Sequence, residues 1–266
     1  MTSPIASDTA WLQPDWPAPA GVGALCTTRN GGHSAPPYNS LNLGSHVGDK
    51  AADVLRNRTQ LQERLAPARP VYLNQVHGTE LVELGQYTPD DLAADGAYTC
   101  ERGVACSIMV ADCLPVLLCD TRGRMVGAVH AGWRGLAGAG GVGVLEEIHQ
   151  RFMQEAPVQP NDSAIEVIAW LGPCIGPRAF EVGPDVVQAF VQDCPDAEQH
   201  FLPQTKGKYL ANLQGLARQK LAALGVIQVF GNDGADMWCT ASNRSQFFSH
   251  RRDRISGRQL ACIWLR

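Results

Sequence analysis

The sequence of 266 residues contains few lysines and no basic block. Lysine and arginine number 22 against 26 aspartates and glutamates, and the formal net charge is −4. Nucleic-acid-binding proteins usually carry a dense stripe of basic side chains, because neutralising phosphates supplies most of their affinity. Only four lysines are present, and the arginines are dispersed apart from Arg251, Arg252 and Arg254. We therefore expect no nucleic-acid partner.

Long apolar runs are also missing. No stretch approaches the roughly 20 apolar residues of a membrane-spanning helix. The N-terminus lacks the basic start and apolar run of a secretory signal. Apolar residues make up 45% of the chain and charged residues 18%, which is an ordinary globular balance. These features predict a globular protein of the cytoplasm with no membrane association.

A disulfide pattern is absent too. The nine cysteines form no Cys-x-x-Cys pair and follow no regular spacing. In a cytoplasmic chain of this size, that argues against a disulfide framework. Most cysteines are therefore expected to be small buried side chains, as at Cys106 and Cys119 within apolar runs.

Short apolar segments rich in β-branched residues predict strands. They span residues 71–76, 104–110, 115–119, 125–129, 165–171, 227–230 and 260–265. Helical periodicity and end signals predict helices at 51–65 (with Asp49 as the N-cap), 144–153, 185–193 and 210–224. Strands outnumber helices and do not alternate strictly with them. This pattern predicts an α+β fold, a single-domain mixed β-sheet sandwich with flanking helices over residues 1–266, in which 1–20 form an irregular N-terminal segment.

Three polar segments stand out from the apolar strands: residues 74–78 (NQVHG), 111–115 (ADCLP) and 130–135 (HAGWRG). Each places a potential metal ligand at a strand end, where side chains of different strands can converge. His77, Cys113 and His130 make a good zinc ligand set, and three protein ligands leave a fourth position open for water. An open position is typical of a catalytic site, where zinc-bound water has a pKa of about 7.

Other interpretations of these residues stay open. A lone histidine at a strand end is most often structural, and a cysteine between apolar strands is most often part of the core. Without a metal, Cys113 could be the nucleophile and His130 the base of a cysteine hydrolase. A non-catalytic zinc-binding module is a third alternative, disfavoured by the open coordination position and the nearby arginine.

Candidate substrate-binding residues lie in other polar segments. Arg29 is in a tight glycine turn (TTRNGG), and Asn42 is in the polar loop that follows. Arg134 begins a glycine-rich stretch that either presents backbone N–H groups to a phosphate or ribose, or lets a helix pack closely on a sheet. Glu181, beyond a GPCIGP loop, is a carboxylate that can reach a cleft. For the arginines, solvated surface charge is the default interpretation.

Taken together, these segments resemble the YfiH family of laccase-domain proteins, also described as multicopper polyphenol oxidases and as purine nucleoside phosphorylases. The matching motifs are TTRNGG, SLNLG, HVGD, NQVHG, ADCLPVLL, HAGWRG, GPCIGP, FEVG and FFSHRRD with GR following. They extend from about residue 25 to the C-terminus. The combination of NQVHG, ADC and HAGWRG is highly specific.

The resemblance implies an α+β fold similar to the catalytic domain of the cytotoxic necrotizing factor toxins, with zinc at His77, Cys113 and His130. It implies a small-molecule substrate: phosphorolysis of adenosine, inosine and methylthioadenosine, and deamination of adenosine. Some bacterial relatives are instead linked to peptidoglycan precursor editing, a hydrolysis that removes a wrong amino acid from a UDP-muramyl precursor. No segment resembles a large interface, so a monomer is expected.

The laccase description implies copper, an alternative that the histidine spacing disfavours. A conventional multicopper oxidase needs several His-x-His pairs around a trinuclear cluster. The seven histidines of this chain are nowhere closer than 13 positions apart. One site of two histidines and a cysteine could still bind Cu²⁺. Copper binding alone would not make the protein a laccase.

Roles follow from each reaction. In a deamination, a carboxylate shuttles the proton, and Asp112 is the first candidate with Glu181 the second, because the H-x-E motif of zinc deaminases is missing. In a phosphorolysis, Arg134 and Arg29 would hold phosphate.

The chain departs from the family pattern in two places. Family members typically have tyrosine at His250 and aspartate at Asn212. The first departure puts a general role of that aromatic hydroxyl in doubt. The second indicates that the acidic group is dispensable or that this member is altered.

Overall fold

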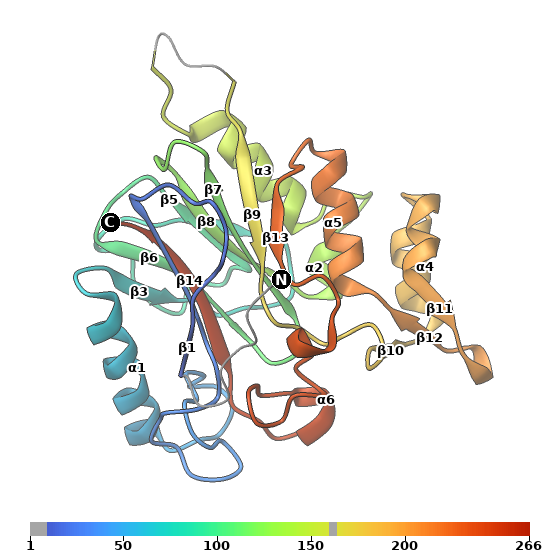
Figure 1. Ribbon diagram of the computed structural model, residues 1–266, viewed down its shortest axis with the longest axis horizontal. Coiled ribbons are helices and arrows are strands. Elements are labelled where there is room, and N and C mark those ends of the chain that lie inside the picture. Colours follow the sequence, from blue (N-terminus) through green and yellow to red (C-terminus); the bar gives the residue numbers. More distant parts are fainter. Residues whose placement is uncertain (1–9, 160–163) are drawn as a thin grey trace.

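The computed structural model describes residues 10–159 and 164–266, and in it two β-sheets lie face to face (Figure 1). Sheet 1 has the strand order β1 (Trp11–Leu12), β2 (Val22–Thr27), β14 (Gln259–Leu265), β6 (Val104–Val110) and β3 (Arg69–Tyr72). Sheet 2 has the order β13 (Val229–Gly231), β9 (Val167–Leu171), β7 (Leu114–Asp120), β8 (Val126–Ala131), β5 (Gly96–Thr99) and β4 (Leu81–Glu83). Both sheets mix parallel and antiparallel pairs.

Strands buried on both faces explain the continuous apolar runs of the sequence. Along β6, Val104, Cys106 and Ile108 belong to the core between the sheets, whereas Ala105 and Met109 face the outer side. Successive side chains of a strand point to opposite faces, so one run serves two cores. β7 divides its side chains between two cores in the same way.

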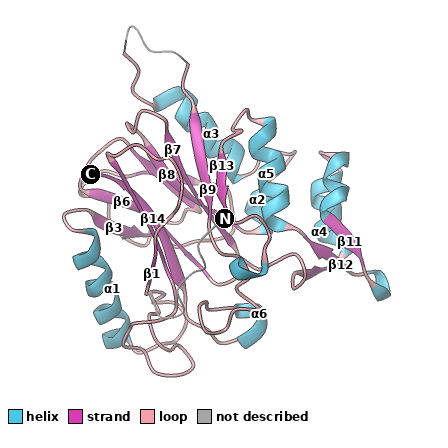
Figure 2. Cartoon of the chain, viewed as in Figure 1, coloured by secondary structure: helices cyan, strands magenta, loops and turns pink. Residues whose placement is uncertain are grey.

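Helices cover the outer face of each sheet (Figure 2). Over sheet 1 lies α1 (Ala51–Leu65), which buries Leu61 and Leu65. Over sheet 2 lie α2 (Trp133–Ala137), α3 (Val144–Glu155) and α5 (Leu213–Ala223). None of the helices in the described ranges is long and apolar enough to cross a membrane.

The remaining elements are short and lie to one side of the sandwich or near its end (Figure 1). They are a third sheet of β10 (Glu181–Val182), β12 (Tyr209–Ala211) and β11 (Phe201–Pro203), α4 (Pro184–Val191), α6 (His250–Asp253), and 3₁₀ turns at Pro195–His200, Thr205–Gly207 and Asp236–Trp238.

The mixed α+β architecture is confirmed, and the segments 104–110 and 51–65 coincide with β6 and α1. The strand predicted at 71–76 is wrong at its end, because β3 stops at Tyr72 and the Gln75 side chain then pairs with Met109 in place of backbone. The strand β2 was missed because Gly23 packs against the Trp264 ring, a partner that lies far away in the sequence.

Two predictions about where segments begin are wrong. The N-terminal segment is not irregular throughout, since Trp11–Leu12 pairs with β2; its residues 1–9 lie outside the described residues. Asp49 is not the cap of α1: the N-cap position is Lys50, without a side-chain hydrogen bond, and the Asp49 carboxylate accepts from Asn42 instead.

The helix predicted at 210–224 begins later because Asn212 caps it. The strand β12 ends at Ala211, and the Asn212 side-chain oxygen accepts a hydrogen bond from Gly215 N–H at 2.8 Å. Asparagine and aspartate are equally good N-caps. The departure at Asn212 therefore keeps the structural role that an aspartate would have.

We predict that Asn212→Ala lowers the free energy of unfolding by about 1 kcal/mol, the usual cost of a lost N-cap, whereas Asn212→Asp changes it by less than about 0.5 kcal/mol. Urea denaturation of the three proteins measures both effects. An Asn212→Ala protein as stable as the parent would show that the cap contributes nothing.

Candidate metal centre and substrate cavity

The strand registers bring the three polar segments to the same end of both sheets. The end of β6 lies beside the start of β14, with Val110 opposite Gln259. The start of β7 lies beside the end of β8, with Leu114 opposite Ala131. Residues 111–113 carry the chain from sheet 1 to sheet 2 at this end. The expectation that strand ends bring these segments together is thus met by the topology.

Asp95 is the residue that organises this end of the sandwich. Its carboxylate is fully buried and accepts a hydrogen bond from the ring Nδ1 of His130 at 2.8 Å. It also accepts from the backbone N–H groups of Val76, His77 and Gly78 at 3.1, 2.9 and 2.6 Å. One carboxylate therefore fixes the orientation of one histidine and the backbone that carries the other.

The loop that carries His77 is held at a second point. The side-chain amide of Gln75 donates to the carbonyl of Met109 and accepts from its N–H, both at 2.9 Å. This pairing extends the edge of β6 beyond the end of β3. His77 itself has φ 63°, a left-handed conformation that costs energy in a non-glycine residue and persists because the Asp95 bonds determine it.

Cys113, His77 and His130 form a group whose ligand atoms all lie within 4.8 Å of one another. The Cys113 Sγ is 3.9 Å from His77 Nε2. Around a tetrahedral zinc with bond lengths of about 2.0–2.3 Å, ligand atoms are about 3.5 Å apart. His77 is exposed and its ring can turn, so small side-chain movements suffice to close the set around an ion. The residues present fit a metal.

Two details of the surroundings favour that interpretation. Because Nδ1 of His130 bonds to Asp95, its Nε2 is the atom left for a ligand, the usual arrangement of a metal-bound histidine with a carboxylate behind it. Gly132 leaves room for the site, since a Cβ there would lie 3.2 Å from both the Cys113 sulfur and the His77 ring.

Charges stabilise one another in this cluster. Burial raises the pKa of Asp95, but the hydrogen bonds from His130 and the backbone bring it below its usual value. Burial also raises the pKa of the Cys113 thiol, and the neighbouring histidines more than offset this and lower it to about 6. The pKa of His130 is lowered by burial and raised by Cys113 and Asp95, with a net rise to about 9. Without a metal, the lowered pKa of Cys113 and the raised pKa of His130 favour a thiolate–imidazolium pair near neutral pH.

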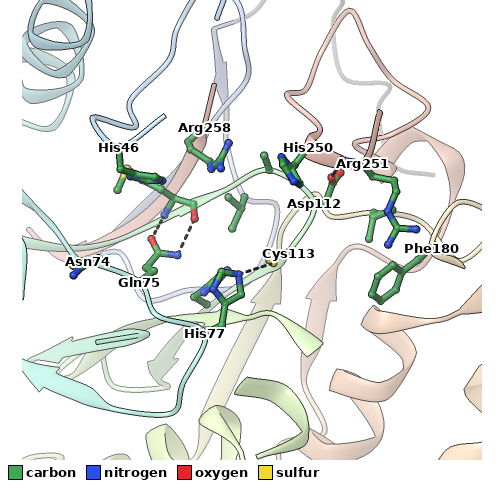
Figure 3. A pocket seen from close by; sticks show the side chains of 15 residues that line it. His46, Asn74, Gln75, His77, Asp112, Cys113, Phe180, His250, Arg251 and Arg258 are labelled. Atoms are coloured by element: carbon green, nitrogen blue, oxygen red, sulfur yellow. Dashed lines mark hydrogen bonds between the residues drawn. The ribbon is translucent and has the colours of Figure 1, made fainter. Parts of the chain in front are cut away.

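The cluster lies in a cavity of about 490 Å³, within the usual size range of small-molecule sites. His77 and Cys113 lie between two unlike sides of this cavity (Figure 3). One side presents His46 and Arg258, and the other presents Phe180, His250 and Arg251, as Figure 3 shows. His250, which replaces the tyrosine expected from the family, thus lines the cavity.

Asp112 also lines the cavity, but both of its oxygens accept short hydrogen bonds. Thr240 Oγ1 donates to Oδ1 and Arg251 N–H donates to Oδ2, each at 2.6 Å. Its φ of 94° turns the chain sharply between the two sheets. Asp112 therefore ties the segment that carries His250 and Arg251 to the chain that carries Cys113, a candidate metal ligand.

Arg29 and Asn42 lie outside the lining of the cavity. The Arg29 guanidinium is 4.8 Å from the centre of the Phe248 ring and donates to the carbonyls of Asn39 and Arg244. Asn42 is fully buried and bonds to the backbone of Gly44 and to Asp49. The structure gives both residues a part in holding loops together.

Arg134 and Glu181 do not line the cavity either. Arg134 is exposed and its guanidinium is 4.4 Å from the centre of the Trp133 ring. The helix α2 that contains it has only five residues. A Cβ at Gly135 would lie 2.5 Å from the Gly78 carbonyl, so this glycine serves close packing. Glu181 is exposed, and its backbone carbonyl accepts from Arg251 Nη1 at 2.8 Å.

Several residues important for this site were not found from sequence. Asp95 sits in an unremarkable LAADGAY segment, and only its burial at a strand start marks it. Arg258 belongs to the GR that follows FFSHRRD in the family pattern, and nothing in the sequence indicates that its side chain lines the cavity. The family motifs HVGD, NQVHG and FEVG contain His46, Gln75 and Phe180, but nothing in the sequence indicates that these side chains share one cavity.

Comparison with known proteins assigns the chain to a family. The model of the multi-copper polyphenol oxidoreductase laccase family matches residues 23–266. Purine nucleoside phosphorylase YfiH of Escherichia coli K12 is 46% identical over 255 residues, which cover 96% of this chain and 98% of that protein. The chain belongs to the YfiH family. A purine nucleoside phosphorylase of Pseudomonas aeruginosa is 47% identical to this chain over 257 residues, which cover 96% of this chain and 98% of that protein.

Solved structures of YfiH-family proteins agree with the fold. A Neisseria meningitidis protein of the DUF152 family has a TM-score of 0.83 and 46% identity, over 97% of this chain and 99% of its own. YlmD from Geobacillus stearothermophilus has a TM-score of 0.82 and 33% identity, over 97% of both chains. The family resemblance is confirmed; the similarity to the necrotizing factor toxins stays a prediction.

We predict that Asp95→Asn weakens zinc binding by about 10- to 100-fold, because its amide cannot accept all four hydrogen bonds and no longer fixes the His130 ring. Competition with a chromophoric chelator measures the affinity. Asp120→Asn is the matched control: Asp120 is equally buried and accepts from the backbone N–H groups of three turn residues, away from the site. Equal losses of zinc affinity in both variants would contradict this role of Asp95.

In metal-free protein, alkylation of Cys113 by iodoacetamide should stay fast from pH 8 down to about pH 6 and fall below that. The reason is the lowered pKa of about 6: the reactive thiolate is present above this pH and is lost as the pH falls through it. Mass spectrometry of the modified peptide follows the reaction, with Cys113→Ala as the blank. A rate that still climbs through pH 8–9, as for an ordinary thiol, would refute the thiolate–imidazolium pair.

Proposed function

We propose that this protein is a zinc-dependent purine nucleoside enzyme that carries out phosphorolysis of adenosine, inosine and methylthioadenosine. The observation that carries the proposal is the convergence of His77, Cys113 and His130 in a cavity large enough for a nucleoside. Relatives named purine nucleoside phosphorylase, which align with nearly the whole chain, support it.

Zinc is the proposed ion because two imidazoles and one thiolate suit it and leave one position open. When bound, it would supply a Lewis acid beside the substrate. The same donors can take copper, as the laccase description suggests. However, His77, Cys113 and His130 are the one group of three or more potential ligands found among the described residues, which provides donors for a single ion and not for a trinuclear cluster.

The side of the cavity with Phe180 is proposed to hold the purine. Phe180 and Ile175 offer apolar surface, and Arg251 lies over the Phe180 ring with its guanidinium carbon 5.5 Å from the ring centre. A flat, electron-poor heterocycle stacks well on such a surface. The hydrogen bonds from Arg251 to Asp112 and Glu181 hold that arginine in place.

In the proposed reaction, a phosphate oxygen forms a bond to C1′ of the ribose while the bond from C1′ to the purine nitrogen breaks. The electron pair of the broken bond goes to the purine, which leaves as the free base with the proton that hydrogen phosphate brought. The products from adenosine or inosine are ribose 1-phosphate and the free base, and methylthioadenosine gives methylthioribose 1-phosphate and adenine. The protein positions both reactants and orients the leaving base at Phe180.

Deamination of adenosine has less support in the cavity. A zinc deaminase needs a carboxylate that can move a proton. Asp112, the first candidate, accepts two hydrogen bonds of 2.6 Å, and Glu181 does not line the cavity. Deamination is therefore proposed as a secondary activity of the same site.

The test is to purify the protein without chelators, determine its metal content and incubate it with adenosine and phosphate. We expect about one zinc per chain and the appearance of adenine with ribose 1-phosphate; Cys113→Ala and His77→Ala should lose zinc and at least about 100-fold in turnover. Cys194→Ala, an exposed cysteine away from the cavity, is the control and should keep both. Full activity of Cys113→Ala without zinc would refute the mechanism.

One observation favours a second candidate, a cysteine hydrolase. Cys113, His130 and Asp95 are linked in space as a nucleophile, a base and a carboxylate that orients the base. Zinc would occupy the thiolate that this chemistry needs. A hydrolase of this kind should therefore be activated by a chelator, whereas the nucleoside enzyme should be inactivated by it.

A further inference from the structure

Arg258 presents a positive charge to the cavity and has no acidic partner. It precedes β14, and its Nη1 donates to the carbonyls of Ser256 and Gly257 at 3.0 and 3.1 Å and to Ser256 Oγ at 3.4 Å. All three acceptors are neutral. Within the described part of the chain, no carboxylate lies within ion-pair distance of Arg258, and its Nε and Nη2 make no hydrogen bond.

The surroundings of this guanidinium are partly desolvated. Burial lowers the pKa of Arg258, and the charges of Cys113 and Asp112 offset this only in part. A half-buried cation without a counter-ion carries a desolvation cost, which an anion bound in the cavity would offset. His46 lines the cavity beside it, and burial followed by Arg258 lowers the pKa of that imidazole. A neutral His46 can donate a hydrogen bond from one ring N–H to an anion, while Arg258 supplies the positive charge.

The position of Arg258 is built by a buried polar network. The Asn42 side-chain oxygen accepts from the Arg258 N–H at 2.8 Å and from Gly44 N–H at 3.0 Å. Asn57 donates to the Asn42 carbonyl at 2.8 Å. A Cβ on Gly44 would lie 2.8 Å from Cγ of Arg258, so the loop leaves a slot for the arginine stem. Asn42 thus contributes to the cavity through Arg258.

We propose that Arg258, with His46, binds inorganic phosphate, the co-substrate of the reaction, on the side of the cavity away from Phe180. This inference rests on the proposed function and names the residue that would select its second substrate. A guanidinium with two free N–H directions matches phosphate oxygens in a bidentate manner. It takes the role that sequence analysis assigned to Arg29 and Arg134.

The arrangement gives the substrates a direction. Figure 3 places Arg258 and His46 on one side of the metal-binding residues, and Phe180 and Arg251 on the other. A purine stacked at Phe180 and a phosphate held at Arg258 would leave the ribose between them. The attacking oxygen and the leaving base would then stand on opposite sides of C1′, as an in-line displacement requires.

The experiment combines binding and kinetics on the zinc-loaded protein. Calorimetric titration with inorganic phosphate alone measures the anion site independently of turnover. Phosphorolysis is then measured with phosphate and adenosine varied in turn. The variants are Arg258→Gln, Arg258→Lys, Arg251→Gln on the purine side, and Arg64→Gln on the far helix α1 as a control for loss of one charge.

We expect Arg258→Gln to weaken phosphate binding and raise the phosphate KM by roughly 10- to 100-fold with little change in the adenosine KM. Arg258→Lys should lose less, since it keeps the charge without the paired donors. Arg251→Gln should raise the adenosine KM instead, and Arg64→Gln should behave as the parent. Unchanged phosphate affinity in a folded Arg258→Gln protein overturns the proposal even if adenosine is cleaved.

The two hypotheses fail in different ways. If phosphate binds to the parent and not to Arg258→Gln, the anion site is supported. If the parent then cleaves no nucleoside, the proposed function is refuted while the anion site stands. Adenosine turnover that is independent of phosphate, with no phosphate binding to the parent, overturns the anion site.

Discussion

The carboxylate of Asp95 accepts one hydrogen bond from the His130 ring and three from the backbone of residues 76–78. Through these bonds a single buried charge holds two candidate metal ligands, His77 and His130, that are 53 positions apart in the chain. It compensates the strained backbone of His77 and selects the ring nitrogen of His130 that faces Cys113. The site depends on this interaction before any ion binds, since it sets the ligand positions in advance.

The two sheets then supply what surrounds the site. Because strand registers align the ends of β3, β6 and β8 with the starts of β7 and β14, the loops at this end form the walls of one cavity. Sheet 1 contributes Arg258 through the entry into β14, and sheet 2 contributes Phe180 through the chain that follows β9. The Phe180 side is completed by His250 and Arg251 of α6, so segments that follow β9 and precede β14 meet there.

Residue type and local motif do not predict which arginine side chains face the cavity. Arg29 and Arg134 lie in glycine-rich turns that look suited to phosphate, yet one packs on Phe248 and the other on Trp133. Arg258 lies in a plain segment before the last strand and faces the cavity. Local glycines describe how the backbone turns, whereas the direction of a long side chain is set by distant residues such as Asn42.

The sequence by itself determined the mixed α+β class, several of the long elements such as β6 and α1, the family and the three candidate ligands. Those properties are local: apolar runs record burial on both faces of a strand, and His77, Cys113 and His130 each stand in a short polar motif beside an apolar segment. Tertiary structure alone decided the role of Asp95, the burial of Asn42 and the side of the cavity on which Arg258 lies. These features depend on contacts between residues far apart in the chain. Strand register and buried hydrogen bonds set such contacts, and a local sequence pattern does not reveal them.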